Sequence, residues 1–91
     1  MGSTDVEVSR DQVRELLSGL MHEIAGISPE KITEDATVEN ELRMESVAFV
    51  ELQVAIEEAY DIELDPIEVV ELNRFGAIVD YVLSCVRDRP S

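Results

Sequence analysis

Ser46 is the residue of this 91-residue chain whose type and position point most directly to chemistry. It follows an irregular stretch that ends at Glu45, and a strongly apolar helical pattern begins at Val47. We therefore expect its hydroxyl at the N-terminus of a helix, where unpaired backbone N–H groups and the helix dipole favour an anion. A phosphodiester attached to this hydroxyl would be stabilised there. The alternative interpretation is an ordinary serine at a helix start.

The only histidine and the only cysteine of the sequence are weaker candidates for reactive residues. His22 has no nucleophile near it in the sequence, so we interpret it as a surface or boundary residue. Cys85 cannot form an intrachain disulfide or belong to a CxxC metal site, and a buried, inert thiol is the expected state.

Three acidic residues, Asp61, Glu63 and Asp65, have the alternating spacing of the first three ligands of a calcium-binding loop. Such a loop needs a glycine where this chain has Pro66, and a bidentate glutamate where it has Leu72. The pattern therefore predicts no defined metal site.

Two amphipathic helices are predicted on either side of a long irregular segment. The first begins after Ser9, the N-cap of a capping box completed by Gln12, and ends at Gly26. Its apolar stripe consists of Val13, Leu16, Leu17, Leu20, Met21 and Ile24. From Ile27 to Glu45 the helical period is lost, and a loop of this length in a small domain is usually functional. Its expected anchors on the core are Ile27, Ile32, Val38 and Leu42.

The second helix is predicted from Ser46 to Tyr60 and has two apolar stripes. One, expected in the core, consists of Phe49, Leu52, Ile56 and either Ala59 or Tyr60. The other consists of Val47, Val50 and Val54. A thin bundle can bury one stripe, so the valines are expected to form an exposed docking surface, although burial in the core or in a dimer is the alternative. The flanking carboxylates, which could also be a plain solvated face, are Glu45, Glu51, Glu57 and Glu58.

A short third helix and a longer fourth helix complete the pattern. Asp65 and Pro66 are typical of a helix start, and Ile67, Val69, Val70 and Leu72 are expected to supply the contacts of the third helix. Asn73 is the expected cap of a fourth helix from about Arg74 to Val86, which Gly76 weakens slightly. Its apolar face consists of Phe75, Ile78, Val79, Val82 and Val86. The predicted fold class is all-α, a small four-helix bundle with a long loop after its first helix.

Charge and composition restrict the classes of partner. Seven basic and twenty-one acidic residues give a net charge of −14, which disfavours nucleic acid and anionic membranes and favours basic patches on other proteins. We see no signal peptide and no membrane-spanning stretch, so a cytoplasmic location is expected. The protein is also expected to be a monomer. The expected organisation is a disordered segment at 1–8, one folded domain at 9–87 and a tail at 88–91.

The segment from Ser46 to Leu52, continued by 55–62 and by the closing helix at 77–82, resembles the acyl carrier protein family and its peptidyl carrier relatives. The resemblance extends over roughly residues 9–86. It implies that Ser46 receives a 4′-phosphopantetheine arm from coenzyme A through a phosphopantetheinyl transferase. The arm then carries acyl groups as thioesters, and the chain itself contributes no catalytic residue. The same resemblance assigns partner binding to Glu45, Val47, Val50, Glu51, Val54, Glu57 and Glu58.

Two residues beside Ser46 depart from the family pattern. Glu45 replaces the usual Asp, and its longer side chain is a poor N-cap; Val47 replaces the usual Leu. Together with the Ala48-Phe49 pair, Glu45 favours a dedicated carrier of a polyketide or related natural-product pathway. The alternatives are a primary fatty-acid carrier and an aminoacyl or peptidyl carrier. Two alternatives belong to other functional classes. One is an unmodified acidic adaptor protein. The other is a small hydrolase with Ser46 as nucleophile, but the sequence shows no base and no oxyanion-hole motif for it.

Overall fold

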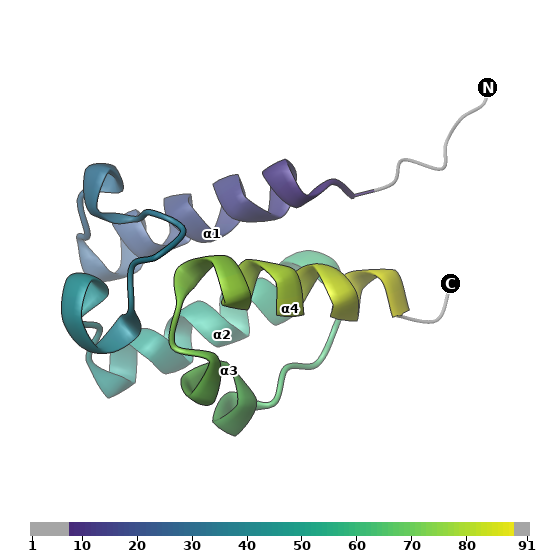
Figure 1. The fold of residues 1–91 in the computed structure, drawn as a ribbon. Coiled ribbons are helices and arrows are strands. Elements are labelled where there is room, and N and C mark those ends of the chain that lie inside the picture. Colours follow the sequence, from purple (N-terminus) through teal and green to yellow (C-terminus); the bar gives the residue numbers. More distant parts are fainter. Residues whose placement is uncertain (1–7, 89–91) are drawn as a thin grey trace.

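The computed structural model describes residues 8–88, which form a bundle of four α-helices (Figure 1). The helices are α1 (Arg10–Ala25), α2 (Ser46–Tyr60), α3 (Pro66–Leu72) and α4 (Phe75–Asp88). This confirms the predicted all-α bundle of three longer helices and a short one. The expected terminal segments 1–8 and 88–91 lie mostly outside the described residues. Each of these segments has one described residue: Val8 packs against the core, and Asp88 is the last residue of α4.

The N- and C-terminal signals of α1 act as the sequence predicts. The Ser9 hydroxyl accepts a hydrogen bond from the Gln12 backbone, while the Gln12 side chain accepts one from the Ser9 N–H, which forms the capping box. Gly26 ends the helix in the left-handed conformation, with φ of 71°. His22 in the last turn lies with Nδ1 3.0 Å from the Ile27 carbonyl oxygen, so this side chain helps to close the turn.

The core lies where α1 contacts both α2 and α4, with α3 packed against α4. Every residue of the predicted apolar face of α4 is buried, whereas α1 buries one residue in each successive turn of its stripe. On α2 the buried residues are Leu52 and Ile56, with Phe49 and Tyr60 half-buried, whereas Ala59 is exposed. The choice between Ala59 and Tyr60 is therefore settled in favour of Tyr60, because the larger side chain reaches the core from the edge of the stripe.

The long loop after α1 is more ordered than the loss of helical period suggests. It contains a 3₁₀ turn at Pro29–Lys31 and a π-helical turn at Val38–Leu42. Its anchors Ile27, Ile32 and Leu42 are buried as predicted, and Val38 is half-buried. Backbone hydrogen bonds join it to the α3–α4 junction: the Val38 N–H donates to the Asn73 carbonyl, and the Phe75 N–H donates to the Ala36 carbonyl, both at 2.8 Å. These hydrogen bonds fix the position of the loop relative to the α3–α4 junction, and the loop in turn leads to the start of α2.

Three expectations about α3 and α4 were wrong. Asn73 does not cap α4; it ends α3 with φ of 63°, and its side-chain oxygen accepts the Glu39 N–H. The first hydrogen bond of α4 instead runs from the Ile78 N–H to the Arg74 carbonyl. Ile67 and Val70 do not supply packing contacts, because the two-turn α3 buries only the side that faces the bundle and leaves these residues 69% and 54% exposed.

Gly76 allows a close approach between α4 and the loop. Its N–H donates to the Glu34 carbonyl at 2.9 Å, and a Cβ at this position would lie 3.1 Å from that same oxygen. The Glu34 carboxylate pairs with Arg10 at 2.7 Å and with Arg14 at 3.1 Å. These ion pairs join α1 to the loop beside Gly76.

We expect Glu34→Gln to lower the unfolding midpoint by a few degrees at most at pH 7. Hydrogen bonding to Arg10 holds the pKa of the Glu34 carboxyl below its ordinary value of 4.5, although burial opposes this shift. The stabilisation is therefore present above pH 4.5 and is lost as the pH falls through the lowered pKa of the folded state. Its size is small because water screens these exposed groups.

Thermal unfolding of the E34Q and wild-type proteins between pH 7 and pH 3 tests this expectation. The two midpoints should converge as the pH falls. Glu30→Gln is the matched control, since Glu30 is exposed and forms no ion pair with the residues at 8–88. A difference between wild type and E34Q that persists unchanged at pH 3 would contradict the assignment.

Candidate functional site

Ser46 is the first residue of α2, and its side chain is exposed. The first hydrogen bond of the helix runs from the Phe49 N–H to the Glu45 carbonyl at 2.8 Å. The N–H groups of Ser46, Val47 and Ala48 therefore have no acceptor within the helix. This confirms the predicted placement of the hydroxyl at the positive end of a helix dipole.

Glu45 occupies the N-cap position but does not cap α2 with its side chain. Its backbone is extended, with φ of −74° and ψ of 159°, as an N-cap requires. A glutamate is one methylene longer than the aspartate that usually fills such a position, and its carboxylate makes no hydrogen bond to the first turn. The first-turn N–H groups are therefore left open to an anion on the neighbouring hydroxyl.

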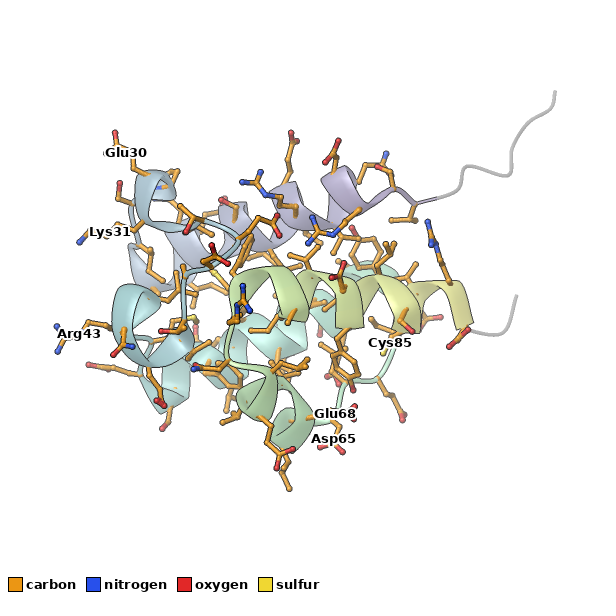
Figure 2. All side chains as sticks on the ribbon, viewed as in Figure 1. Glu30, Lys31, Arg43, Asp65, Glu68 and Cys85 are labelled. Carbon is orange, nitrogen blue, oxygen red and sulfur yellow. The ribbon has the colours of Figure 1, made fainter. Side chains whose placement is uncertain are left out.

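The residues just before Ser46 are held by a tight turn. The Thr37 hydroxyl accepts a hydrogen bond from the Asn40 N–H at 3.1 Å, and Leu42 is buried. Arg43 then adopts a left-handed conformation, with φ of 46°, and turns the chain toward α2. Figure 2 shows the Arg43 side chain pointing away from the bundle at this end of the molecule, as does Lys31 from the 3₁₀ turn.

An exposed apolar strip follows Ser46 along α2, and we call Val47, Val50 and Val54 the valine strip. Their side chains are 68%, 59% and 45% exposed. The spacing of three and four residues places them on one face of the helix. The predicted exposure is confirmed for the single chain, and the alternative of burial in the core is wrong.

The four carboxylates beside the valine strip differ in their exposure to solvent and in their hydrogen bonds within the chain. Glu45, Glu51 and Glu58 are exposed. Glu57 is half-buried, and its carboxylate accepts a hydrogen bond from the Leu64 N–H at 2.8 Å. It therefore holds the segment between α2 and α3, a structural role that its sequence position did not indicate. A role of these four residues in partner binding stays a prediction.

A second apolar patch lies on α3, where Pro66, Ile67, Val70 and Glu71 line a shallow, open depression. We did not predict this exposure from the sequence, because Ile67 and Val70 have the helical spacing of core residues. The length of α3, only seven residues, was the available signal, since two turns can bury only one narrow side.

The sole cysteine does not form a reactive site. Cys85 on α4 is half-buried, and burial raises the pKa of its thiol above the ordinary value, which lowers the reactive thiolate fraction. Figure 2 shows it on the same side of the molecule as Glu68 and Asp65, and the nearby charge of Glu68 raises the pKa further. The interpretation of an unreactive thiol is in accord with this setting.

A small helical bundle that presents an exposed hydroxyl at the start of a helix, beside an apolar strip with carboxylates, has the architecture of a carrier domain. Comparison with known families identifies it further, because the family model described as "Phosphopantetheine attachment site" matches residues 15–82. The chain therefore belongs to this family, that of the acyl carrier proteins.

Curated relatives of the chain are acyl carrier proteins. An acyl carrier protein of Tropheryma whipplei (strain Twist) is 28% identical over 79 residues, which cover 87% of this chain and 96% of the relative. The meromycolate extension acyl carrier protein of Mycobacterium leprae (strain TN) is 23% identical over 83 residues, 91% of this chain and 72% of the relative. An acyl carrier protein of Acidothermus cellulolyticus is 28% identical over 75 residues, 82% of this chain and 89% of the relative.

The prosthetic group of this family is covalently bound 4′-phosphopantetheine. The start of α2 fits a phosphodiester, because an exposed hydroxyl stands beside three first-turn N–H groups and the Glu45 side chain does not occupy them. When bound, the arm supplies a thiol on which acyl groups are held as thioesters. Acyl carrier proteins are carriers rather than catalysts. No helix within residues 8–88 is long and apolar enough to cross a bilayer.

Proposed function

We propose that Ser46 is the attachment residue and that the protein carries acyl intermediates as thioesters on the arm. The observation that supports this most directly is that the family match at 15–82 includes an exposed hydroxyl at the first position of α2. Among residues 8–88, no group forms a hydrogen bond with this hydroxyl, so nothing has to be broken before it reacts.

Loading breaks the phosphoanhydride bond between the two linked phosphates of coenzyme A and forms a phosphodiester on Ser46. The Ser46 oxygen forms a bond to the phosphorus atom that bears the pantetheine in coenzyme A, and 3′,5′-ADP leaves with the electrons of the broken P–O bond. The serine proton passes to a base on the transferase.

The test of the proposed function is a mass measurement. Incubation with coenzyme A and a transferase of broad specificity should add the mass of one phosphopantetheine per chain, and peptide mapping should place it on the peptide that contains Ser46. An unmodified adaptor would gain no mass, and that result would refute the proposal.

We further propose that partners dock on the valine strip and on the carboxylates beside it. The strip combines apolar contact area with negative charge, and partners with basic patches complement both. Exposed ion pairs are worth only about 0–1 kcal/mol each, so a carrier held by several of them can dissociate after each transfer.

Glu51→Lys is expected to lower kcat/KM of the transferase for this protein roughly tenfold, because a favourable pairing is replaced by repulsion between like charges. Glu51 lies four residues after Val47, on the same side of α2 as the valine strip. The loss should shrink as salt is raised from 0.05 to about 0.5 M, since salt screens exposed charges.

Glu23→Lys is the matched control for this variant. Glu23 is exposed on α1, and its replacement changes the net charge by the same amount. Steady-state loading rates measured by intact mass should be nearly unchanged for E23K. Equal losses in both variants would show that only net charge matters and would contradict docking at the valine strip.

We propose a polyketide or related natural-product pathway for this carrier. The support is the Glu45 substitution together with the Ala48-Phe49 pair after Ser46. Identification of the native thioester by mass spectrometry of protein isolated from its source cells tests this. A saturated chain lengthened by two-carbon steps would instead indicate a primary fatty-acid carrier, and an amino acid would indicate an aminoacyl or peptidyl carrier.

A further inference from the structure

The inside of the bundle next to the start of α2 is almost completely filled. The side chains that line it come mainly from the four helices and leave a cavity of only about 10 Å³. That is about the space of a single water molecule, and the lining is nearly all apolar. The cavity in this state has no room for even a short hydrocarbon chain.

Phe49 is the residue of the cavity lining that lies nearest to Ser46 along the chain. It lies three residues after Ser46, which is one turn along the same side of α2. Its ring is half-buried and forms part of the cavity lining, together with Ile78 and Val82 of α4. An acyl chain that entered the bundle from Ser46 would therefore have to displace this ring.

The segment after α2 is fastened to the helix by two hydrogen bonds at one residue. The Gln53 side chain donates to the Leu64 carbonyl at 3.4 Å, and the Glu57 carboxylate accepts the Leu64 N–H at 2.8 Å. The Tyr81 hydroxyl on α4 also accepts the Asp65 N–H at 3.1 Å. Leu64 itself is buried and lines the cavity, so the segment cannot swing out without breaking these bonds and exposing Leu64.

We infer that this carrier leaves its cargo in solvent, and that Phe49 is the residue that excludes acyl chains from the bundle. The inference rests on the proposed function of Ser46. Cargo that stays in water is short or polar, because a long alkyl chain outside the protein would expose its apolar surface. The cargo class is therefore short or polar acyl groups rather than long saturated chains.

The test compares acetyl and octanoyl forms of the complete protein, loaded from the corresponding coenzyme A thioesters by a transferase of broad specificity. The readouts are the methyl NMR resonances of Ile78 and Val82 and the thermal unfolding midpoint. In the wild type both should be the same for the two acyl groups. In Phe49→Ala, whose truncation enlarges the cavity, the octanoyl form should shift both methyl groups and raise the midpoint by several degrees relative to the acetyl form.

Ile67→Ala is the matched control, because it removes a similar apolar side chain from an exposed position that does not line this cavity. It should behave as the wild type does. If Phe49→Ala does not fold, Phe49→Leu removes less volume, and Gln53→Ala loosens the fastening at Leu64 without touching the ring. In at least one of these variants, the methyl resonances and the unfolding midpoint should then differ between the acetyl and octanoyl forms.

Two results would overturn the inference while leaving the proposed function in place. One is a loaded wild-type protein whose Ile78 and Val82 methyl groups shift with the octanoyl chain. The other is a set of folded, loaded Phe49 variants that are as insensitive to chain length as the wild type. Failure to gain mass at all would instead refute attachment at Ser46, and the two proposals are thereby separated.

Discussion

Ser46→Ala is expected to abolish the addition of phosphopantetheine while leaving the helix content and the unfolding midpoint almost unchanged. The hydroxyl is the proposed nucleophile, and alanine has no atom that can replace it. The fold should tolerate the change because the side chain is exposed and because the N-cap of α2 is Glu45, so no cap is lost. Alanine is also the best helix former, which favours the first turn of α2.

Intact mass after incubation with coenzyme A and the transferase measures the loss, and circular dichroism measures the fold. Ser84→Ala is the matched control, since Ser84 is likewise an exposed serine on a helix. It should load to the same extent as the wild type. A gain of mass by S46A would place the attachment elsewhere, and a loss of loading in S84A would show that the assay responds to something other than the Ser46 hydroxyl.

Phe75→Ala is expected to remove about 3–5 kcal/mol from the free energy of unfolding, as truncation of a fully buried aromatic residue usually does. Phe75 is 0% exposed and is the largest of the fully buried side chains among residues 8–88. A domain of this size is stable by only about 5–10 kcal/mol, so the variant should be partly unfolded at 37 °C. Loading at Ser46 should fall with the folded fraction, because the unfolded chain does not form the first turn of α2 that presents the hydroxyl.

Urea unfolding at 25 °C gives the free energies for this comparison. Val70→Ala, an exposed apolar truncation on α3, should change stability by less than about 0.5 kcal/mol. If F75A does not fold at all, Phe75→Leu still gives a measurable loss, since it leaves a smaller cavity. A loss below about 1.5 kcal/mol in F75A would mean that the core collapses around the missing ring and that Phe75 is not the main contact of α4.

Local signals in the sequence were sufficient for much of the site. The start of α2 at Ser46 and its end at Tyr60 agree with the prediction, because the apolar period begins and ends there. The valine strip could be recognised because two apolar stripes on one helix exceed what a thin bundle can bury. The capping box of α1 and the Asp65-Pro66 start of α3 involve only residues a few positions apart.

Features that depend on distant residues were not predictable in the same way. Asn73 looked like a cap for the helix that follows it, but its side chain binds Glu39 of the loop. Glu57 looked like one more surface carboxylate, but it binds the Leu64 backbone. Gly76 looked like a slight weakness of α4, but it admits the Glu34 backbone. Glu39 and Glu34 lie far along the chain from Asn73 and Gly76, and Leu64 lies beyond the end of α2, so no helical or turn period predicts these contacts.

The sequence by itself determined the helices, the exposed hydroxyl at the start of α2 and the charge of the surface around it, because periodicity, capping and composition act within a few residues. Only the tertiary structure decided how the loop is joined to the α3–α4 junction, which carboxylate beside the valine strip is engaged, and how little space remains beneath Phe49. These depend on volumes and hydrogen bonds contributed by several helices at once, and packing at that density is a property of the folded chain as a whole.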